Sequence, residues 1–359
     1  MTHHGRAPSS AVARACATTI AGLIVCIVLC LGANTSRAAS DGGVHPESWP
    51  QARSAGLVDK ATEARISALM ARMSLEEKVG QVIQTDIGEI TPEDLRRYPL
   101  GSILAGGGSG PNGDERASAD VWLELSRSFH AVSIEPRAGH TPIPLMFGID
   151  AVHGHNNVVG AVIYPHNIGL GAAHDADVVR RIGTATAEAL AATGIDWTFA
   201  PTLAVPQDVR WGRSYEGFAQ DPALVRLYAQ AAVEGIQGPA NLTGKIQSGR
   251  VAASAKHFLG DGGTAGGVDQ GDTQVAESDL IRLHAQGYVG AIDAGVLTVM
   301  ALQGEDTGAC RDINFDPLVL PSGIAASDDP LLSARSAAYS QSFTRREGEV
   351  KPPSAVRPD

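Results

Sequence analysis

The sequence predicts an α/β fold built around a parallel β-sheet, and three observations support this fold class. Short apolar runs alternate along the chain with longer amphipathic stretches of helical periodicity. The short runs are apolar almost throughout, which is typical of strands buried on both faces of a parallel sheet. Glycine is abundant, at 41 residues, which suits the many tight loops of such a fold. A barrel and an open, doubly wound sheet both fit this pattern.

The apolar runs define six expected strands, each followed by turn residues or by a helical pattern. The strands are predicted at residues 81–85, 101–105, 144–150, 196–201, 251–258 and 296–301. Helices are predicted at residues 59–79, 115–133, 176–193, 222–236 and 277–293. Within the first of these, Ser74 and Glu77 form the S-x-x-E pattern of a capping box, which marks a helix start. A complete barrel of this kind needs eight strands, so a barrel here would be incomplete.

Residues 1–39 have the features of a secretory signal peptide. Arg6 and Arg14 precede an apolar run at residues 18–33, and Ser36-Arg37-Ala38 offers a cleavage site of the small-x-small type. The run is shorter than the roughly 20 apolar residues that a membrane-spanning helix needs. We therefore expect cleavage, no stable membrane span afterwards, and export to the periplasm or the medium. A retained membrane anchor is the alternative.

The rest of the chain divides into three parts by composition. Residues 40–58 are expected to be an extended lead-in, and residues 59–301 carry the alternating βα pattern of a globular domain. Residues 302–359 are rich in Pro, Ser and charged residues and have no βα rhythm. These features are typical of a disordered tail.

The net charge of the chain limits the classes of molecule that we expect it to bind. The net charge is −11 at pH 7, and residues 1–39 contain three arginines and no acid, so their removal takes it to −14. Such acidity argues against nucleic acid and anionic membranes as partners. Residues 40–309 contain no cysteine, so stability must come from a large core and not from disulfides.

Polar side chains gather where the predicted strands end. They are Asp150, Arg213, and the adjacent pair Lys256 and His257. In parallel α/β folds this edge of the sheet binds ligands, and a buried lysine is costly unless it is paired. Each candidate has a plain structural alternative. Asp150 could cap a helix, Arg213 could belong to an internal salt-bridge cluster, and Lys256 could reach solvent beside a core histidine.

Two further motifs are weak. His153 and His155 form an H-x-H pair, but a metal site needs more ligands than these two. The glycine-rich stretch at residues 106–113 lacks the Lys-Ser/Thr that completes a phosphate-binding loop. We therefore expect neither a metal nor a cofactor.

Taken together and in this order, the motifs resemble those of glycoside hydrolase family 3, in its β-glucosidase and exo-β-glucanase branch. The resemblance covers roughly residues 45–301. The matching text is MSLEEKVGQ (73–81), GSILAGGGS (101–109), PLMFGIDAVHGHNNVVGAVIYPHNIGLGA (144–172), WTFAPTLAVPQDVRWGRSYEGFAQDP (197–222), VAASAKHFLGDGGT (251–264) and GVLTVM (295–300).

The resemblance implies a (β/α)8 TIM-type barrel as the first domain, here with about six of its eight βα units. It implies retaining hydrolysis of terminal non-reducing β-D-glucosyl residues from β-glucosides or β-glucan oligosaccharides, without a cofactor. The residues implied to hold the terminal glucose are Asp150, Arg213, Lys256 and His257, with Met300 lining the same pocket. The branch that cleaves N-acetylglucosaminides is disfavoured, because no histidine lies between His257 and His284.

The sequence departs from the family pattern after Ala301. The family's nucleophilic aspartate is expected near residues 330–340, on an apolar strand and before a tryptophan, and no such text is present. The second domain, which carries the acid/base glutamate, has no counterpart either. We therefore identify no catalytic residue, and a frameshifted or truncated reading frame is the hypothesis. The alternative to an active glycosidase is a non-catalytic sugar-binding or misfolded fragment.

Overall fold

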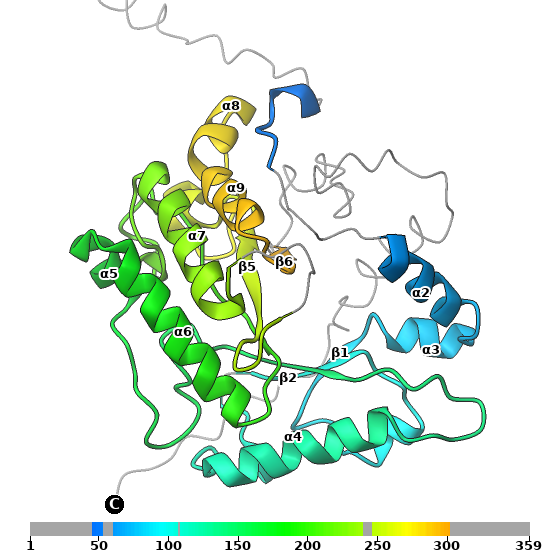
Figure 1. Ribbon diagram of the computed structural model, residues 1–359. Coiled ribbons are helices and arrows are strands. Elements are labelled where there is room, and N and C mark those ends of the chain that lie inside the picture. The colour runs from blue at the N-terminus through cyan, green and yellow to red at the C-terminus, as the bar shows by residue number, and fades with distance from the viewer. Residues whose placement is uncertain (1–44, 53–59, 107, 240–245, 302–359) are drawn as a thin grey trace, which may run out of the picture. The chain divides into compact units, whose positions relative to one another are not determined.

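The computed structural model describes residues 45–52, 60–106, 108–239 and 246–301. Six parallel strands form one sheet in the order β1-β2-β3-β4-β5-β6, which is also their order along the chain. Figure 1 labels β1, β2, β5 and β6 of this sheet. Each strand overlaps one of the six predicted runs, which confirms them. Their bounds are β1 Gln84–Asp86, β2 Ser102–Ala105, β3 Met146–Ile149, β4 Trp197–Thr198, β5 Ala252–Phe258 and β6 Thr298–Ala301.

Helices fill the connections, and the five predicted helical regions all contain one. The bounds of the α-helices are α2 Lys60–Met70, α3 Leu75–Gly80, α4 Ala119–Ser133, α5 Asn167–Ala173, α6 Ala176–Ala192, α7 Pro222–Gln237, α8 Glu277–Asp279 and α9 Gln286–Asp293. The short 3-10 segments are η1 Pro46–Ser48, η2 Asp94–Arg96, η3 Pro111–Gly113, η4 Ser214–Glu216, η5 Asp261–Gly263 and η6 Ala265–Gly267, and η7 Leu280–His284 is a π-helical turn. Helix α5 is absent from the sequence prediction, whereas the π-helical turn lies within the helix predicted at residues 277–293.

The strand order decides between the two predicted architectures. In a doubly wound sheet the order reverses at a switch point, whereas here each new strand is added beside the preceding one. Successive parallel strands joined by helical crossovers are the construction of a β/α barrel. The described strands supply six of the eight that a complete barrel has, so the predicted incomplete barrel is confirmed.

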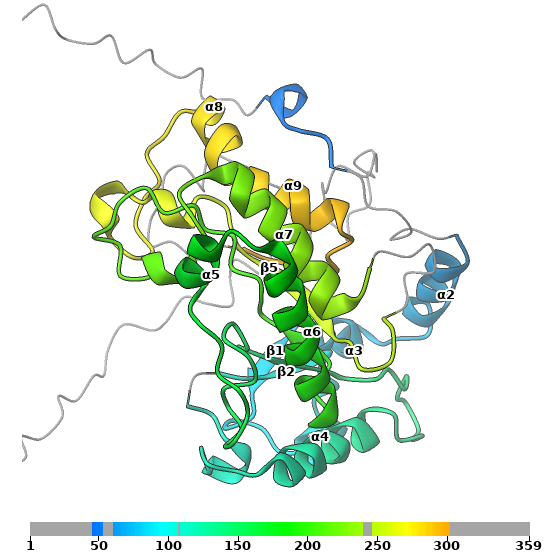
Figure 2. The ribbon, with the colours of Figure 1, turned by 60° about the vertical axis from the view of Figure 1, so that its left-hand side comes forward.

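Helix α7 is central to the packing of the crossover helices. It contacts both α6 and α9, and Figures 1 and 2 show the three helices side by side. Val225, Tyr228 and Val233 on α7 are completely buried, and burying each such side chain contributes about 1.5–3 kcal/mol. The Tyr228 hydroxyl donates to the Leu170 carbonyl oxygen at 3.1 Å. This contact joins α7 to α5, which lies next to the candidate site.

Helix starts follow the predicted capping chemistry. The Ser74 hydroxyl accepts from the Glu77 N–H at 3.1 Å, and the Glu77 carboxylate accepts from the Ser74 N–H at 3.0 Å. This reciprocal pair is the predicted capping box. Asp175 and Asp221 cap α6 and α7 through their carboxylates. These caps satisfy N–H groups that the first turn of a helix leaves without a partner.

Several predictions concern residues outside the described ranges. The signal peptide at residues 1–39 and the tail at residues 302–359 both lie there, so they remain predictions. Part of the lead-in is described, and Pro46–Ser48 forms a 3-10 turn where extended chain was expected. In the described part of the chain, no helix has both the length and the apolar character to cross a membrane.

Candidate active site

The candidate residues lie at the carboxyl ends of neighbouring strands. Asp150 directly follows β3, and Lys256 and His257 belong to the last part of β5. The ladder continues beyond β4, because the Lys256 N–H donates to the Pro201 carbonyl oxygen and the Leu203 N–H donates to that of Lys256. The loop that follows carries Arg213, immediately before η4. The sheet therefore brings together four residues from three segments that are far apart in the sequence.

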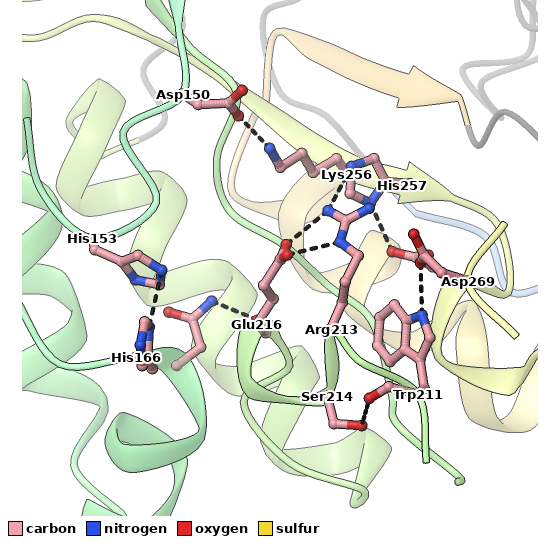
Figure 3. Close-up of polar contacts among 12 residues, drawn as sticks. Asp150, His153, His166, Trp211, Arg213, Ser214, Glu216, Lys256, His257 and Asp269 are labelled. Atoms are coloured by element: carbon pink, nitrogen blue, oxygen red, sulfur yellow. Dashed lines mark hydrogen bonds and ion pairs between the residues drawn. The ribbon is translucent and has the colours of Figure 1, made fainter. Parts of the chain in front are cut away.

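Lys256 and Asp150 form an ion pair within this cluster (Figure 3). The Lys256 Nζ lies 2.5 Å from the Asp150 Oδ1. The lysine side chain is only 6% exposed, whereas the aspartate side chain is 50% exposed. Lys256 therefore does not reach solvent, and the buried cation holds a carboxylate that is open to solvent. Asp150 begins no helix, so its alternative role as an N-cap is wrong.

His257 faces the same cluster as Lys256, although the two residues are adjacent on a strand. The β5–β6 register shifts between Lys256 and Phe258, so the strand is irregular at His257. The His257 Nδ1 lies 2.7 Å from the Asp261 Oδ2, and its Nε2 lies 3.4 Å from the Arg213 Nη2. The strand end thus directs both side chains to one polar site (Figure 3).

Arg213 is held by Glu216 in a bidentate ion pair. The Nε and Nη2 of Arg213 donate to the two carboxylate oxygens of Glu216 at 2.7 and 2.8 Å. Burial raises the pKa of Glu216, but the hydrogen bonds and charge of Arg213 outweigh it, so the pKa lies below its ordinary value. The same hydrogen bonds raise the pKa of Arg213. The salt-bridge interpretation of this loop is therefore correct for Arg213, and the pair also fixes the guanidinium group.

Met300 lies next to Lys256 in the sheet. The two residues are register partners in the parallel β5–β6 ladder, and Met300 is half-buried. Partners in a ladder project to the same face of the sheet. Met300 therefore lies on the same face of the sheet as Lys256, and its role in lining a sugar pocket stays a prediction.

The two histidines of the H-x-H motif have different surroundings. His153 lies at the site, with its Nε2 3.0 Å from the His166 Nδ1, and burial lowers its pKa. His155 is buried elsewhere, where its Nε2 lies 2.9 Å from the Thr193 Oγ1 and burial lowers its pKa to about 4. Within the described ranges, no three His, Cys, Asp or Glu side chains are grouped so that they could hold a metal ion.

Two acidic residues of the site were absent from the predicted set. Glu216 holds Arg213, and Asp261 contacts His257. Both are almost fully buried, with exposed fractions of 8% and 2%. The sequence offered one signal for these contacts, which is the short spacing within each pair. Glu216 lies three residues after Arg213, and Asp261 lies four residues after His257. Residues at this spacing come into contact when the backbone turns between them.

The fold and this cluster agree with the comparison to protein families. Residues 74–305 match the model of the glycosyl hydrolase family 3 N terminal domain. The chain belongs to glycosyl hydrolase family 3. The match includes all six strands and each of the predicted binding residues. It identifies the incomplete barrel as part of this family's N-terminal domain.

The similar proteins in this comparison are named as β-glucosidases or as a β-glucanase. The structure resembles an exo-1,3/1,4-beta-glucanase from a Pseudoalteromonas species with a TM-score of 0.69 and 46% identity, over 72% of this chain and 32% of that one. A lysosomal beta glucosidase from Dictyostelium discoideum is 32% identical over 264 residues, which are 69% of this chain and 32% of the relative. A periplasmic beta-glucosidase from Salmonella typhimurium is 29% identical, over 68% of this chain and 29% of the relative. The chain therefore spans about a third of the length of these relatives.

Proposed function

We propose that this family member acts on β-glucosides or β-glucan oligosaccharides and that the cluster at the strand ends holds the terminal glucosyl residue. The observation that carries the proposal is the pair of Lys256 and Asp150. A buried ammonium group holds a half-exposed carboxylate at the edge of the sheet where barrel enzymes bind their ligands. The relatives named as β-glucosidases support the choice of sugar.

The cluster offers both types of hydrogen-bonding group that vicinal sugar hydroxyls require. The Asp150 carboxylate accepts hydrogen bonds, and the Arg213 guanidinium donates them. Because Glu216 fixes Arg213 and Lys256 fixes Asp150, little side-chain entropy remains to be lost when a sugar binds. Met300 beside Lys256 would contribute an apolar wall to the same pocket.

The same residues are poorly suited to cleave the glycosidic bond. Retaining glycosidases use a nucleophilic carboxylate and a carboxylic acid about 5–5.5 Å apart. The acid needs a raised pKa to stay protonated, whereas the pKa of Glu216 is lowered. We infer that the cluster binds and orients the sugar and that the 359-residue chain hydrolyses it slowly or not at all.

We further propose that the protein is exported, with residues 1–39 as the signal peptide. The charged start, apolar run and small-residue cleavage site support this. The Salmonella relative is named as periplasmic. Mass spectrometry of the mature protein from a secreting host would show whether the chain begins after residue 39.

A pair of arginine variants tests the proposed binding site. Arg213→Gln removes the guanidinium group of the cluster, whereas Arg210→Gln removes an exposed arginine of the same loop that pairs with Asp208. By calorimetry, we expect D-glucose and cellobiose to bind the wild type and the Arg210 variant equally. The Arg213 variant should bind at least about tenfold more weakly, because it loses charge-assisted hydrogen bonds. Equal affinity in both variants, or no binding to the wild type, would contradict the proposal.

Hydrolysis is tested separately. We expect no release of nitrophenol from nitrophenyl β-D-glucoside at ordinary enzyme rates, which are about 1–1,000 per second. Turnover in that range by the purified chain would show that a nucleophile and an acid are present after all.

A further inference from the structure

The two ring nitrogens of His257 have different neighbours, and this difference defines their roles. The Nδ1 lies 2.7 Å from the Asp261 Oδ2, and the Nε2 lies 3.4 Å from the Arg213 Nη2. Asp261 is 2% exposed, and its other oxygen has no hydrogen-bond partner among the described residues. Asp261 is thus directed at His257.

Arg213 determines which nitrogen of His257 carries the proton. A guanidinium group donates hydrogen bonds and never accepts them, so Arg213 can bond the Nε2 only if that nitrogen is unprotonated. The neutral ring then has its proton on Nδ1, which donates to Asp261. A proton on Nε2 would instead face the cation, which the bidentate contact with Glu216 holds in place.

We propose that Asp261 is a positioning residue, which holds His257 in the Nδ1–H tautomer and leaves its Nε2 as a hydrogen-bond acceptor for the sugar. This proposal rests on the proposed function, since it deepens the role of the same site. It assigns a role to the aspartate of the sequence HFLGDGG, which lies four residues after His257.

The assignment has a consequence for ligand selectivity. A ligand atom that inserts between the Arg213 Nη2 and the His257 Nε2 replaces their 3.4 Å contact, so it must accept a hydrogen bond from the first and donate one to the second. A hydroxyl group does both, whereas fluorine and a methoxy group only accept. The pair therefore selects for a free hydroxyl at one position of the sugar ring.

The tautomer can be measured directly by ¹⁵N NMR of the full chain labelled on histidine, without any ligand. A His257→Gln variant identifies the resonances of His257. We expect a protonated Nδ1 and an unprotonated Nε2. A protonated Nε2, alone or together with Nδ1, would overturn the proposal. Because no sugar is present, this result does not depend on whether the proposed function is correct.

Two aspartate variants test whether Asp261 sets the tautomer. Asp261→Asn can turn its amide N–H toward the Nδ1, so we expect the Nε2–H form to become populated. Asp269→Asn is the matched control, because Asp269 is exposed and contacts Trp211 instead; the His257 signals should not change. Unchanged signals in a folded Asp261 variant would overturn the positioning role. If circular dichroism shows that this variant is unfolded, the wild-type spectrum still decides the tautomer.

Sugar analogues test the acceptor role of the Nε2. Among deoxyfluoro-glucoses, we expect a position at which fluorine weakens binding to the wild type at least tenfold but has little effect in a His257→Phe variant, because the hydrogen bond donated to the Nε2 exists only in the wild type. Binding unaffected by fluorine at every position would overturn the acceptor role. Absence of glucose binding altogether would contradict the proposed function instead, and the tautomer measurement would stand.

Discussion

The Lys256 Nζ lies 2.5 Å from the Asp150 Oδ1, although the two residues are 106 positions apart in the sequence. The lysine is buried and the aspartate is half-exposed. The two partners therefore depend on the contact to different degrees. Without Lys256, the Asp150 carboxylate can still be hydrated, whereas without Asp150 a buried ammonium group loses its counter-ion.

This asymmetry predicts unequal effects of two substitutions on stability. Asp150→Ala should lower the free energy of unfolding by about 2 kcal/mol, less than for a fully buried pair because the aspartate is partly hydrated. Lys256→Met, which keeps the apolar stem, should change it by less than about 1 kcal/mol. Urea unfolding at pH 7 measures both values. The reverse order of effects would show that Lys256 is not buried in solution. Both variants should lose glucose affinity.

Glu216 should make the stability sensitive to acid. Its pKa lies below the ordinary value of 4.5 because of Arg213, so its contribution is complete above pH 4.5 and disappears as the pH falls through the lowered pKa. At pH 7, Glu216→Gln should cost about 2 kcal/mol in unfolding free energy. At pH 3 the difference from wild type should be smaller. Glu124→Gln, on the exposed side of α4, is the control and should have little effect at either pH. A cost that is the same at pH 7 and pH 3 would contradict the ion pair.

His284 should make the stability depend on pH in a higher range than Glu216 does. Burial lowers its pKa from 6.5 to about 4, so the unfolded chain binds the proton first. Stability is therefore complete above about pH 6.5 and decreases as the pH falls toward 4, by about 2 kcal/mol at pH 5. His284→Gln should reduce the difference in unfolding free energy between pH 7 and pH 5 by this amount. The exposed His174, replaced by Asn, should leave that difference unchanged.

Gly171 on α5 touches the loop that carries Arg213. A Cβ atom there would lie only 1.7 Å from the Phe218 carbonyl oxygen, whereas a Cβ on Gly169 would lie 3.8 Å from Pro165. Gly171→Ala should therefore destabilise the protein by at least about 2 kcal/mol and weaken glucose binding, because the loop must move. Gly169→Ala in the same helix should be neutral or stabilising by about 0.5–1 kcal/mol. Thermal unfolding and calorimetry of both variants test this, and similar effects at both positions would refute it.

The positions of the strands could be predicted from the sequence because each is a short apolar run with a helical pattern next to it. The length of the fourth strand could not be predicted in this way. Assigned strand β4 ends at Thr198, although backbone hydrogen bonds continue to Leu203. Helix α5 was missed because its sequence, NIGLGAA, has two glycines and no side-chain cap. Its position depends on close tertiary contact at Gly171, which has no local signature.

The four polar candidate residues at the strand ends were predicted from their location after apolar runs and from the family resemblance. Their partners were harder to predict. Arg213 was grouped with Asp150 as a ligand-binding residue, but its hydrogen bonds go to Glu216 and His257. Such partners depend on how the loop after β4 and the segment after β5 turn, and the types of residue alone do not specify those turns.

Burial in the sheet is greatest toward its middle strands. All four residues of β3 are at least partly buried and three are fully so, and β5 begins with five buried residues, whereas β1 and β6 contain none. Amide hydrogens exchange with solvent through local opening, which needs least free energy where burial is low. Exchange should therefore be slow in β3 and β5 and fast in the two outer strands. Because Lys256 belongs to β5 and Asp150 directly follows β3, the ion pair proposed to hold the sugar would persist while the outer strands open repeatedly.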